Sequence, residues 1–151
     1  MIAIPPASPT LWAHRLAYAG LIPFVGLALA LWFLEPSHHA IIAGALLGYS
    51  ATIASFIGAI YWGLVLRDAA KQSLPLLAWG VLPSLLAWLA LLAGSSLGLF
   101  LMAVLLWLCF AVDRVQYPRF QVQGWLPMRL ILTAVASASC TLGALRILSF
   151  T

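Results

Sequence analysis

The stretch GALLGYSATIASFIGAIYW, residues 44–62, is as hydrophobic as a membrane-spanning helix, but one of its sides carries almost no bulk. At about 100° per residue, the small residues form one narrow stripe on the helix. The stripe contains Gly44, Gly48, Ala51, Ser55, Gly58 and Ala59. In lipid, hydrophobicity does not drive helices together, whereas small residues let two backbones approach closely. We therefore predict that this segment is the central helix of a bundle, with Gly44, Gly48 and Gly58 as helix-packing residues.

The composition of the whole chain also indicates a membrane protein. Of its 151 residues, 65% are hydrophobic and only 7% are charged, and the mean hydropathy is +1.11. A soluble domain carries about a quarter of charged residues, so most of this surface must face lipid. The net charge of +4 would suggest nucleic acid in a soluble protein. Here no basic face exists to carry such a partner, and we expect none.

Apolar runs divide the chain into five segments that are long enough to cross a bilayer, which takes about 20 residues in a helix. The expected helices cover about 11–34, 40–66, 74–93, 96–113 and 125–148. A Pro-rich lead over residues 1–10 precedes them and lacks the basic start of a cleavable signal peptide. The sequence thus predicts an all-α, polytopic integral membrane bundle of five transmembrane helices in a single domain, residues 11–151.

The basic residues predict the orientation of this bundle. With five spans, six of the seven Lys and Arg residues fall on one side of the membrane, namely Arg15, Arg67, Lys71, Arg114, Arg119 and Arg129. Only Arg146 falls on the other side. Cytoplasmic ends of membrane helices carry an excess of positive charge. We therefore expect the N-terminus in the cytoplasm and the C-terminus outside.

Two prolines inside predicted helices, Pro23 and Pro83, each remove a backbone donor and free a carbonyl one turn earlier. Nearby hydroxyls could bond those carbonyls or line a mid-membrane pocket between the second and third helices. The candidate ligand-binding residues are Tyr49, Thr52, Ser55, Phe56, Ser84 and Trp88. The alternative is ordinary helix packing with each hydroxyl bonded to a local carbonyl, which is the usual role of small hydroxylated residues in membranes.

Asp113 is the acidic residue at the end of the fourth predicted helix, on the side where the basic residues gather. A charge inside the membrane is by default a candidate functional group. Its neighbours favour interfacial ion pairs with Arg67, Arg114 or Arg129 over a proton relay. Such a pair would tie the second, fourth and fifth helices together.

The remaining reactive side chains complete no recognisable site in the sequence. Glu35, His38 and His39 fall in the first outer connection and could bind a metal or sense pH, but no Cys or further His is expected there to complete a metal shell. Cys109 and Cys140 are expected at different depths, which favours two buried thiols over a disulfide. We expect no metal and no cofactor.

Three segments of the chain resemble a known family. They are Ala19–Phe24 (AGLIPF), Tyr49–Gly63 (YSATIASFIGAIYWG) and Leu82–Trp88 (LPSLLAW), and Asp113 and the stretch 125–129 fit the same pattern. The family comprises small multi-span bacterial membrane proteins of unknown function, related to the mitochondrial transmembrane protein 69. The resemblance implies a multi-pass protein of the bacterial inner membrane, or its mitochondrial counterpart. It implies no reaction, substrate or catalytic residue.

No spacing of nucleophile and base, phosphate loop or metal motif is present in the sequence, so we expect that the protein is not an enzyme. The first hypothesis is a structural or accessory protein that binds other membrane proteins, or a second copy of itself, among the membrane lipids. The alternative is binding or transport of a small hydrophobic molecule, such as a quinone or a lipid, in the pocket between the second and third helices.

Overall fold

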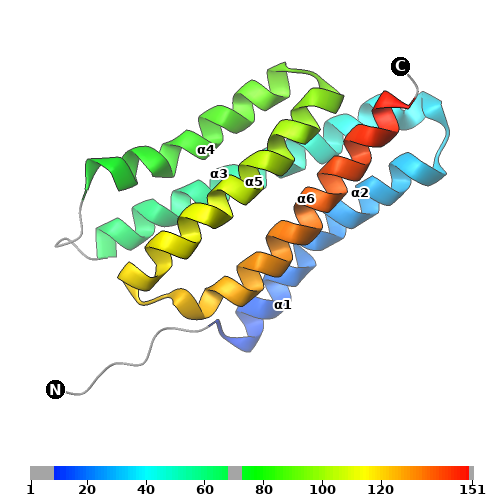
Figure 1. The fold of residues 1–151 in the computed structure, drawn as a ribbon. Helices are drawn as coiled ribbons and strands as arrows, with labels where there is room; N and C mark the ends of the chain where they lie inside the picture. The colour runs from blue at the N-terminus through cyan, green and yellow to red at the C-terminus, as the bar shows by residue number, and fades with distance from the viewer. Residues whose placement is uncertain (1–8, 68–72, 150–151) are drawn as a thin grey trace, which may run out of the picture.

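A computed structural model describes residues 9–67 and 73–149 (Figure 1). In those ranges the chain forms helices and no strand. Five stretches of the described residues are long and apolar enough to cross a membrane: Leu11–Phe33, Pro36–Arg67, Leu74–Leu92, Ser95–Phe120 and Gln123–Leu148. The predicted class, an all-helical bundle with five membrane spans, is confirmed. Residues 1–8 of the predicted lead and Lys71 lie outside the described residues.

The first span is divided at Gly20 into α1, Leu11–Ala19, and α2, Leu21–Phe33. The sequence led us to expect one helix over 11–34, interrupted at Pro23. Because Pro23 has no N–H, the carbonyl of Ala19 lacks its usual partner, and the helix breaks one turn before the proline. The hydroxyl of Tyr49 donates a 2.8 Å hydrogen bond to the carbonyl of Gly20. From the sequence, Thr52, Ser55 and Ser84 were the hydroxyls expected to bond the freed carbonyls. They donate instead to carbonyls of their own helices, so none of them bonds the carbonyl of Ala19.

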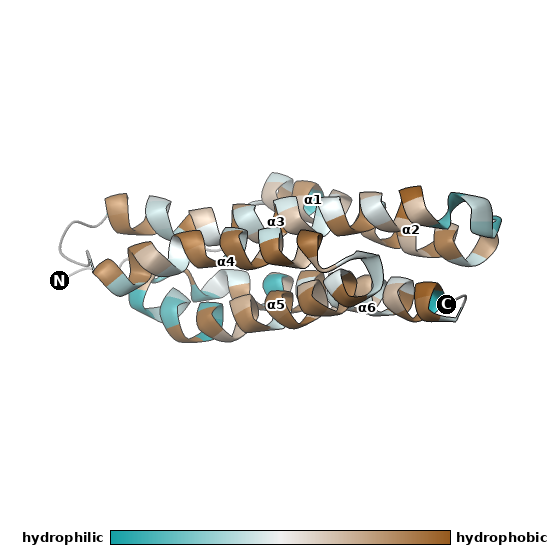
Figure 2. Cartoon of the chain, turned by 90° about the horizontal axis from the view of Figure 1, so that it is seen from above, coloured by the Kyte–Doolittle hydropathy of each residue, from teal (hydrophilic) through white to brown (hydrophobic). Residues whose placement is uncertain are grey.

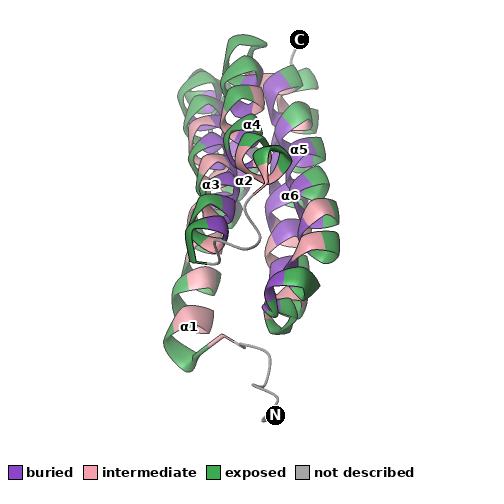
Figure 3. Cartoon of the chain, turned by 90° about the vertical axis from the view of Figure 1, so that its left-hand side faces the viewer, coloured by how far each residue is buried: buried purple, intermediate pink, exposed green. Residues whose placement is uncertain are grey.

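The central helix is α3, His39–Arg67, which follows the short 3₁₀ turn η1, Pro36–His38. It packs against α2, α4, α5 and α6, so its predicted central place is confirmed. Leu46 of α3 and Leu99 and Met102 of α5 are completely buried in the core. Figure 3 shows the buried residues turned toward the interior of the bundle and the exposed ones outward.

The remaining helices are α4, Leu74–Leu92, α5, Ser95–Gln116, and α6, Leu126–Leu148. The turn between α4 and α5 requires Gly94, whose φ of 86° is rarely adopted by residues with a side chain. Helix α5 continues past Asp113, where the sequence led us to expect its end. Two 3₁₀ turns, η3 (Tyr117–Phe120) and η4 (Gln123–Trp125), connect it to α6.

Helices α3 and α4 approach each other closely at two glycines. A Cβ on Gly58 would lie 2.7 Å from the carbonyl oxygen of Gly80 and 3.2 Å from Cγ of Pro83. A Cβ on Gly80 would lie 2.3 Å from the Trp62 ring, whose Nε1 donates to the Leu77 carbonyl at 3.1 Å. Gly58 and Pro83, both expected to be helix-packing residues, thus lie at this close approach of α3 and α4.

The other predicted packing glycines behave differently. In the described part of the chain, nothing lies within 4 Å of a Cβ built on Gly44 or Gly48, so neither glycine permits a close helix contact there. The stripe of small residues is therefore divided: its C-terminal part contacts α4, and Gly44 is exposed. Pro23, also expected to be a helix-packing residue, is half-buried and lies three residues after the break in the first span.

The outer surface of the bundle is apolar along its length, and polar residues gather toward its ends (Figure 2). Leu16 and Phe33 are 72% and 82% exposed, as expected of side chains that face lipid. The start of α1, the end of α3 and the turns η3 and η4 lie at one end of the bundle, whereas η1 and the C-terminus of α6 lie at the other (Figure 1). Arg15, Arg67, Arg114, Arg119 and Arg129 are therefore near one end, and Arg146 is near the opposite end.

Candidate functional site

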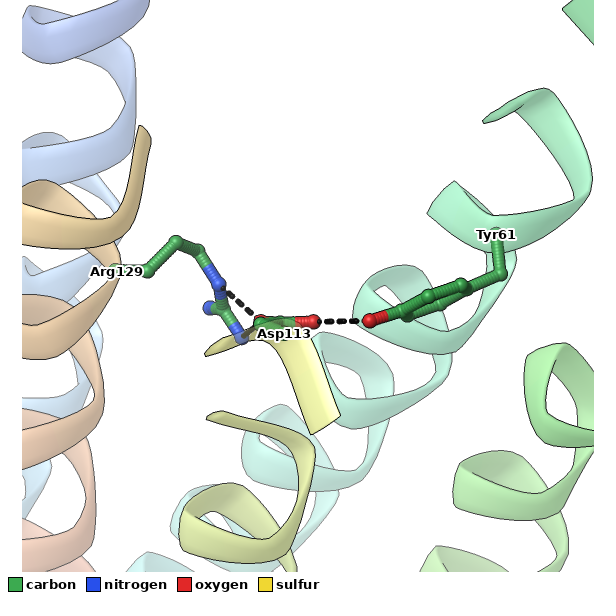
Figure 4. Close-up of polar contacts among 3 residues, drawn as sticks. All are labelled: Tyr61, Asp113 and Arg129. Carbon is green, nitrogen blue, oxygen red and sulfur yellow. Dashed lines mark hydrogen bonds and ion pairs between the residues drawn. The ribbon is translucent and has the colours of Figure 1, made fainter. Parts of the chain in front are cut away.

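Three helices meet at a buried polar network near the basic end of the bundle (Figure 4). Nε and Nη2 of Arg129 on α6 donate to Oδ2 of Asp113 on α5, at 2.8 and 2.7 Å. The hydroxyl of Tyr61 on α3 donates to Oδ1 of the same carboxylate at 2.8 Å. Asp113 and Tyr61 are fully buried, and Arg129 is 7% exposed. Each oxygen of the carboxylate therefore has a partner, which is what a buried charge requires.

The predicted ion pair of Asp113 is confirmed for Arg129, and the network joins the second, fourth and fifth spans as expected. Its other members differ from the prediction. Arg67 donates through Nη2 to the carbonyl of Phe120 at 3.1 Å, and Arg114 is exposed. The link to α3 is Tyr61, which the sequence reasoning missed. Its position toward the same end of α3 as Arg67 was the available signal.

A cavity of about 650 Å³ lies beside this network. Its wall comes from α1, α2, α3 and α6, with contributions from α5 and the η3–η4 connection. Most lining side chains are wholly apolar. The side chains of the lining that carry a polar group are those of Arg67, Tyr117, Trp125, Arg129 and Thr133. Ligand pockets in proteins typically measure about 300–1,000 Å³ and combine an apolar lining with a few polar groups, and this cavity has both properties.

Of the six predicted ligand-binding residues, only Phe56 lines this cavity. The hydroxyls of Thr52, Ser55 and Ser84 donate to carbonyls of their own helices, at 2.7, 2.9 and 2.6 Å. Trp88 is 57% exposed. These three hydroxyls therefore bond within their own helices, as the alternative of ordinary helix packing predicted. The cavity lies away from α4, which contributes none of its lining residues.

Tyr49, the remaining predicted ligand-binding residue, does not line the cavity but contacts two residues that do. Its ring packs edge-on against Phe24 with 5.0 Å between ring centroids, and its hydroxyl bonds Gly20. Both Phe24 and Gly20 line the cavity. Tyr49 therefore fixes the position of the break between α1 and α2, next to which the cavity opens.

The remaining candidate groups lie elsewhere. Glu35 and His38 are exposed, while His39 is buried with Nε2 3.3 Å from the Leu34 carbonyl. Within residues 9–67 and 73–149, no three His, Cys, Asp or Glu side chains are placed to share a metal ion. Cys109 and Cys140 are buried free thiols, as expected.

The chain is similar to a family of unknown function and to transmembrane proteins, and the descriptions of these proteins mention no reaction. The family described as "Protein of unknown function (DUF3429)" matches residues 9–145. Transmembrane protein 69 of Xenopus tropicalis is 35% identical over 129 residues, which are 82% of this chain and 50% of the relative. Transmembrane protein 69 of Mus musculus is 29% identical over 130 residues, 84% of this chain and 53% of the relative. The chain thus spans about half the length of the curated relatives it matches. No solved structure matches it.

Proposed function

This chain belongs to the DUF3429 family of proteins of unknown function, and from that premise we propose that it is a non-enzymatic binding protein that holds one small hydrophobic molecule within the bilayer. The observation that supports this proposal is the cavity of about 650 Å³ between α1, α2, α3 and α6. This is the second of the two functions considered from the sequence, with the site on the opposite side of α3.

The position of the cavity favours a ligand that arrives from the membrane. Leu16 and Phe56 line the cavity and are also 72% and 67% exposed on the outer surface. The apolar lining is therefore continuous with the surface that faces lipid. A hydrophobic molecule could enter from the bilayer without crossing water, and its apolar surface would contact side chains in place of lipid tails.

Helix α1 forms the wall that can be changed with the least risk to the fold, because none of its residues is buried. Ala17 lines the cavity, whereas Ala19 of the same helix is exposed and does not. We expect Ala17→Trp to reduce the amount of retained small molecule at least about fivefold, since overfilling a packed site costs about 1–3 kcal/mol. Ala19→Trp should retain the wild-type amount.

The measurement is native mass spectrometry of the protein extracted from its own membrane with bound lipids retained. A defined small-molecule adduct on the wild type and on Ala19→Trp, absent from Ala17→Trp, would support the proposal. Adducts of equal amount on all three variants, or none on any, would refute it. Thermal unfolding of both variants verifies that each is folded.

We further propose that the protein resides in a bacterial inner membrane with the Arg67 and Arg129 end in the cytoplasm. The support is the excess of basic residues near that end of the helices. Alkaline phosphatase fused to the C-terminus should then be active, because that enzyme folds only outside the cytoplasm, and a green fluorescent protein in the same place should be dark. The reverse pattern would contradict this orientation.

A second candidate is the accessory role, in which the chain binds another membrane protein or a second copy of itself. The specific observation in its favour is the open part of the small-residue stripe. Gly44 and Gly48 lie on the central helix with nothing within 4 Å of a Cβ, so another helix could approach them closely. The same mass spectrometry distinguishes the two functions, because a stoichiometric second polypeptide without a small molecule would favour the accessory role.

A further inference from the structure

We infer that Thr133 selects the occupant of the cavity, and that this occupant is a neutral hydrophobic molecule with a carbonyl group rather than an anionic lipid. The inference rests on the proposed function, because it names the chemical class of the molecule that the same cavity would hold. It depends on the hydrogen bonding of Thr133 and on the charge balance of the neighbouring wall.

The hydroxyl of Thr133 is the exception among those of α6. Ser137, Ser139 and Thr141 each donate to a carbonyl of their own helix, at 3.2, 2.9 and 2.9 Å. Thr133 is 2% exposed and lines the cavity, yet its Oγ1 has no hydrogen-bond partner among the residues that the structure describes. A buried hydroxyl without a partner is unfavourable. A ligand in the cavity is a partner that the chain itself does not provide.

Charge next to Thr133 argues against an anionic group. Arg129 lies one turn before Thr133 on α6 and lines the same cavity. Both Nε and Nη2 of Arg129 are bonded to Asp113, so its positive charge is matched by a carboxylate. Sites for phosphates and acidic headgroups use Arg side chains whose charge is available to the ligand. Arg129 therefore presents no unmatched positive charge beside Thr133, which favours a neutral polar group there. Arg67, at the end of α3, is a second arginine of the lining and donates to the carbonyl of Phe120. The anionic probe below tests whether its charge attracts an acidic group.

A carbonyl oxygen fits the hydroxyl of Thr133 because a threonine O–H donates to an acceptor. Threonine in a helix adopts either of two χ1 rotamers, and the proposed contact uses the rotamer that turns Oγ1 into the cavity. The apolar part of the lining includes Leu132 and Ala136 on the same helix and Phe24 on α2. This arrangement suits a single carbonyl group attached to a ring and an apolar chain.

The test uses three probes that share a phenyl ring and a twelve-carbon chain: 1-phenyldodecan-1-one, 1-phenyldodecane and 4-dodecylbenzoate. The first two differ only in the replacement of a carbonyl by a methylene. Binding to the full chain in detergent is measured by native mass spectrometry titration. We expect the ketone to bind the wild type about fivefold more tightly than the hydrocarbon, as one hydrogen bond would provide.

The Thr133→Val variant keeps the shape of the side chain and removes the hydroxyl, so it should abolish the advantage of the ketone without changing the affinity of the hydrocarbon. Thr133→Ser should retain the advantage. Equal affinities of ketone and hydrocarbon for the wild type, or tighter binding of 4-dodecylbenzoate, would overturn the inference but leave the cavity as a binding site. If Ala17→Trp leaves the binding of all three probes unchanged, the proposed function itself fails.

Discussion

Replacing Asp113 with alanine is expected to lower the free energy of unfolding by about 3–5 kcal/mol, the usual effect of removing one partner from a buried ion pair. In the wild type, the carboxylate accepts two hydrogen bonds from Arg129 and one from Tyr61. Without it, the guanidinium of Arg129 would remain buried with its charge unmatched, and the hydroxyl of Tyr61 would lose its acceptor. The helices α3, α5 and α6 would lose the contact that joins them at this end.

Further variants distinguish the effect of removing both members of the Asp113–Arg129 ion pair from the effect of removing one of them. Asp113→Leu combined with Arg129→Met should restore much of the stability, because an apolar pair of similar size often replaces a buried ion pair without loss. Tyr61→Phe should cost less, about 1.5–3 kcal/mol, since it removes one hydrogen bond to a charged group. Unfolding by a denaturing detergent gives the free energies. An Asp113→Ala protein as stable as the control Glu35→Ala, changed at an exposed position, would contradict the assigned role.

Replacing Gly58 with leucine should cost about 3 kcal/mol or more of unfolding free energy, at the upper end of the range for overfilled cores. The new Cβ alone would lie 2.7 Å from the backbone oxygen of Gly80. A backbone atom cannot turn aside as a flexible side chain can, so α3 and α4 must separate. That separation would also strain the hydrogen bond from Trp62 to Leu77.

A matched control lies on the same helix. Gly44 has no atom within 4 Å of a Cβ, so Gly44→Leu should leave the stability of the monomer unchanged or slightly raised, because leucine favours a helix over glycine by somewhat less than 1 kcal/mol. Detergent unfolding of the two variants is compared directly. Equal losses of stability would show that the Gly58 contact has no special role. A change of oligomeric state in Gly44→Leu alone would indicate a partner on the open part of the stripe.

The sequence was sufficient to predict the parts of the fold that depend on which segments are apolar enough to enter lipid. Hydropathy and length predicted the five spans, and the small-residue stripe predicted α3 as the central helix. The pairing of Asp113 with an arginine was also predictable, because a charge near the membrane needs a partner close by. The spans and the central helix depend on local composition, and the ion pair depends on an acidic residue, a type that is scarce in this chain.

The cavity was not predictable from the sequence, for two physical reasons. Hydroxyl groups suggested a site between the second and third helices, but Thr52, Ser55 and Ser84 are all satisfied within their own helices. The actual lining includes Ile53 and Ile57, large residues opposite the small stripe, which in a membrane protein could equally face lipid. Only the packing of α1, α2 and α6 distinguishes a cavity from a lipid-facing surface.

The most direct test of the central claim, that the cavity holds a hydrophobic molecule, is a crystal structure of the full chain purified from its own membrane and crystallised in a lipid mesophase. We expect continuous non-protein density between Phe24, Ile57 and Met128, which all line the cavity, with its polar end near Thr133. A structure in which α1 closes onto α6 and side chains fill this volume would contradict it.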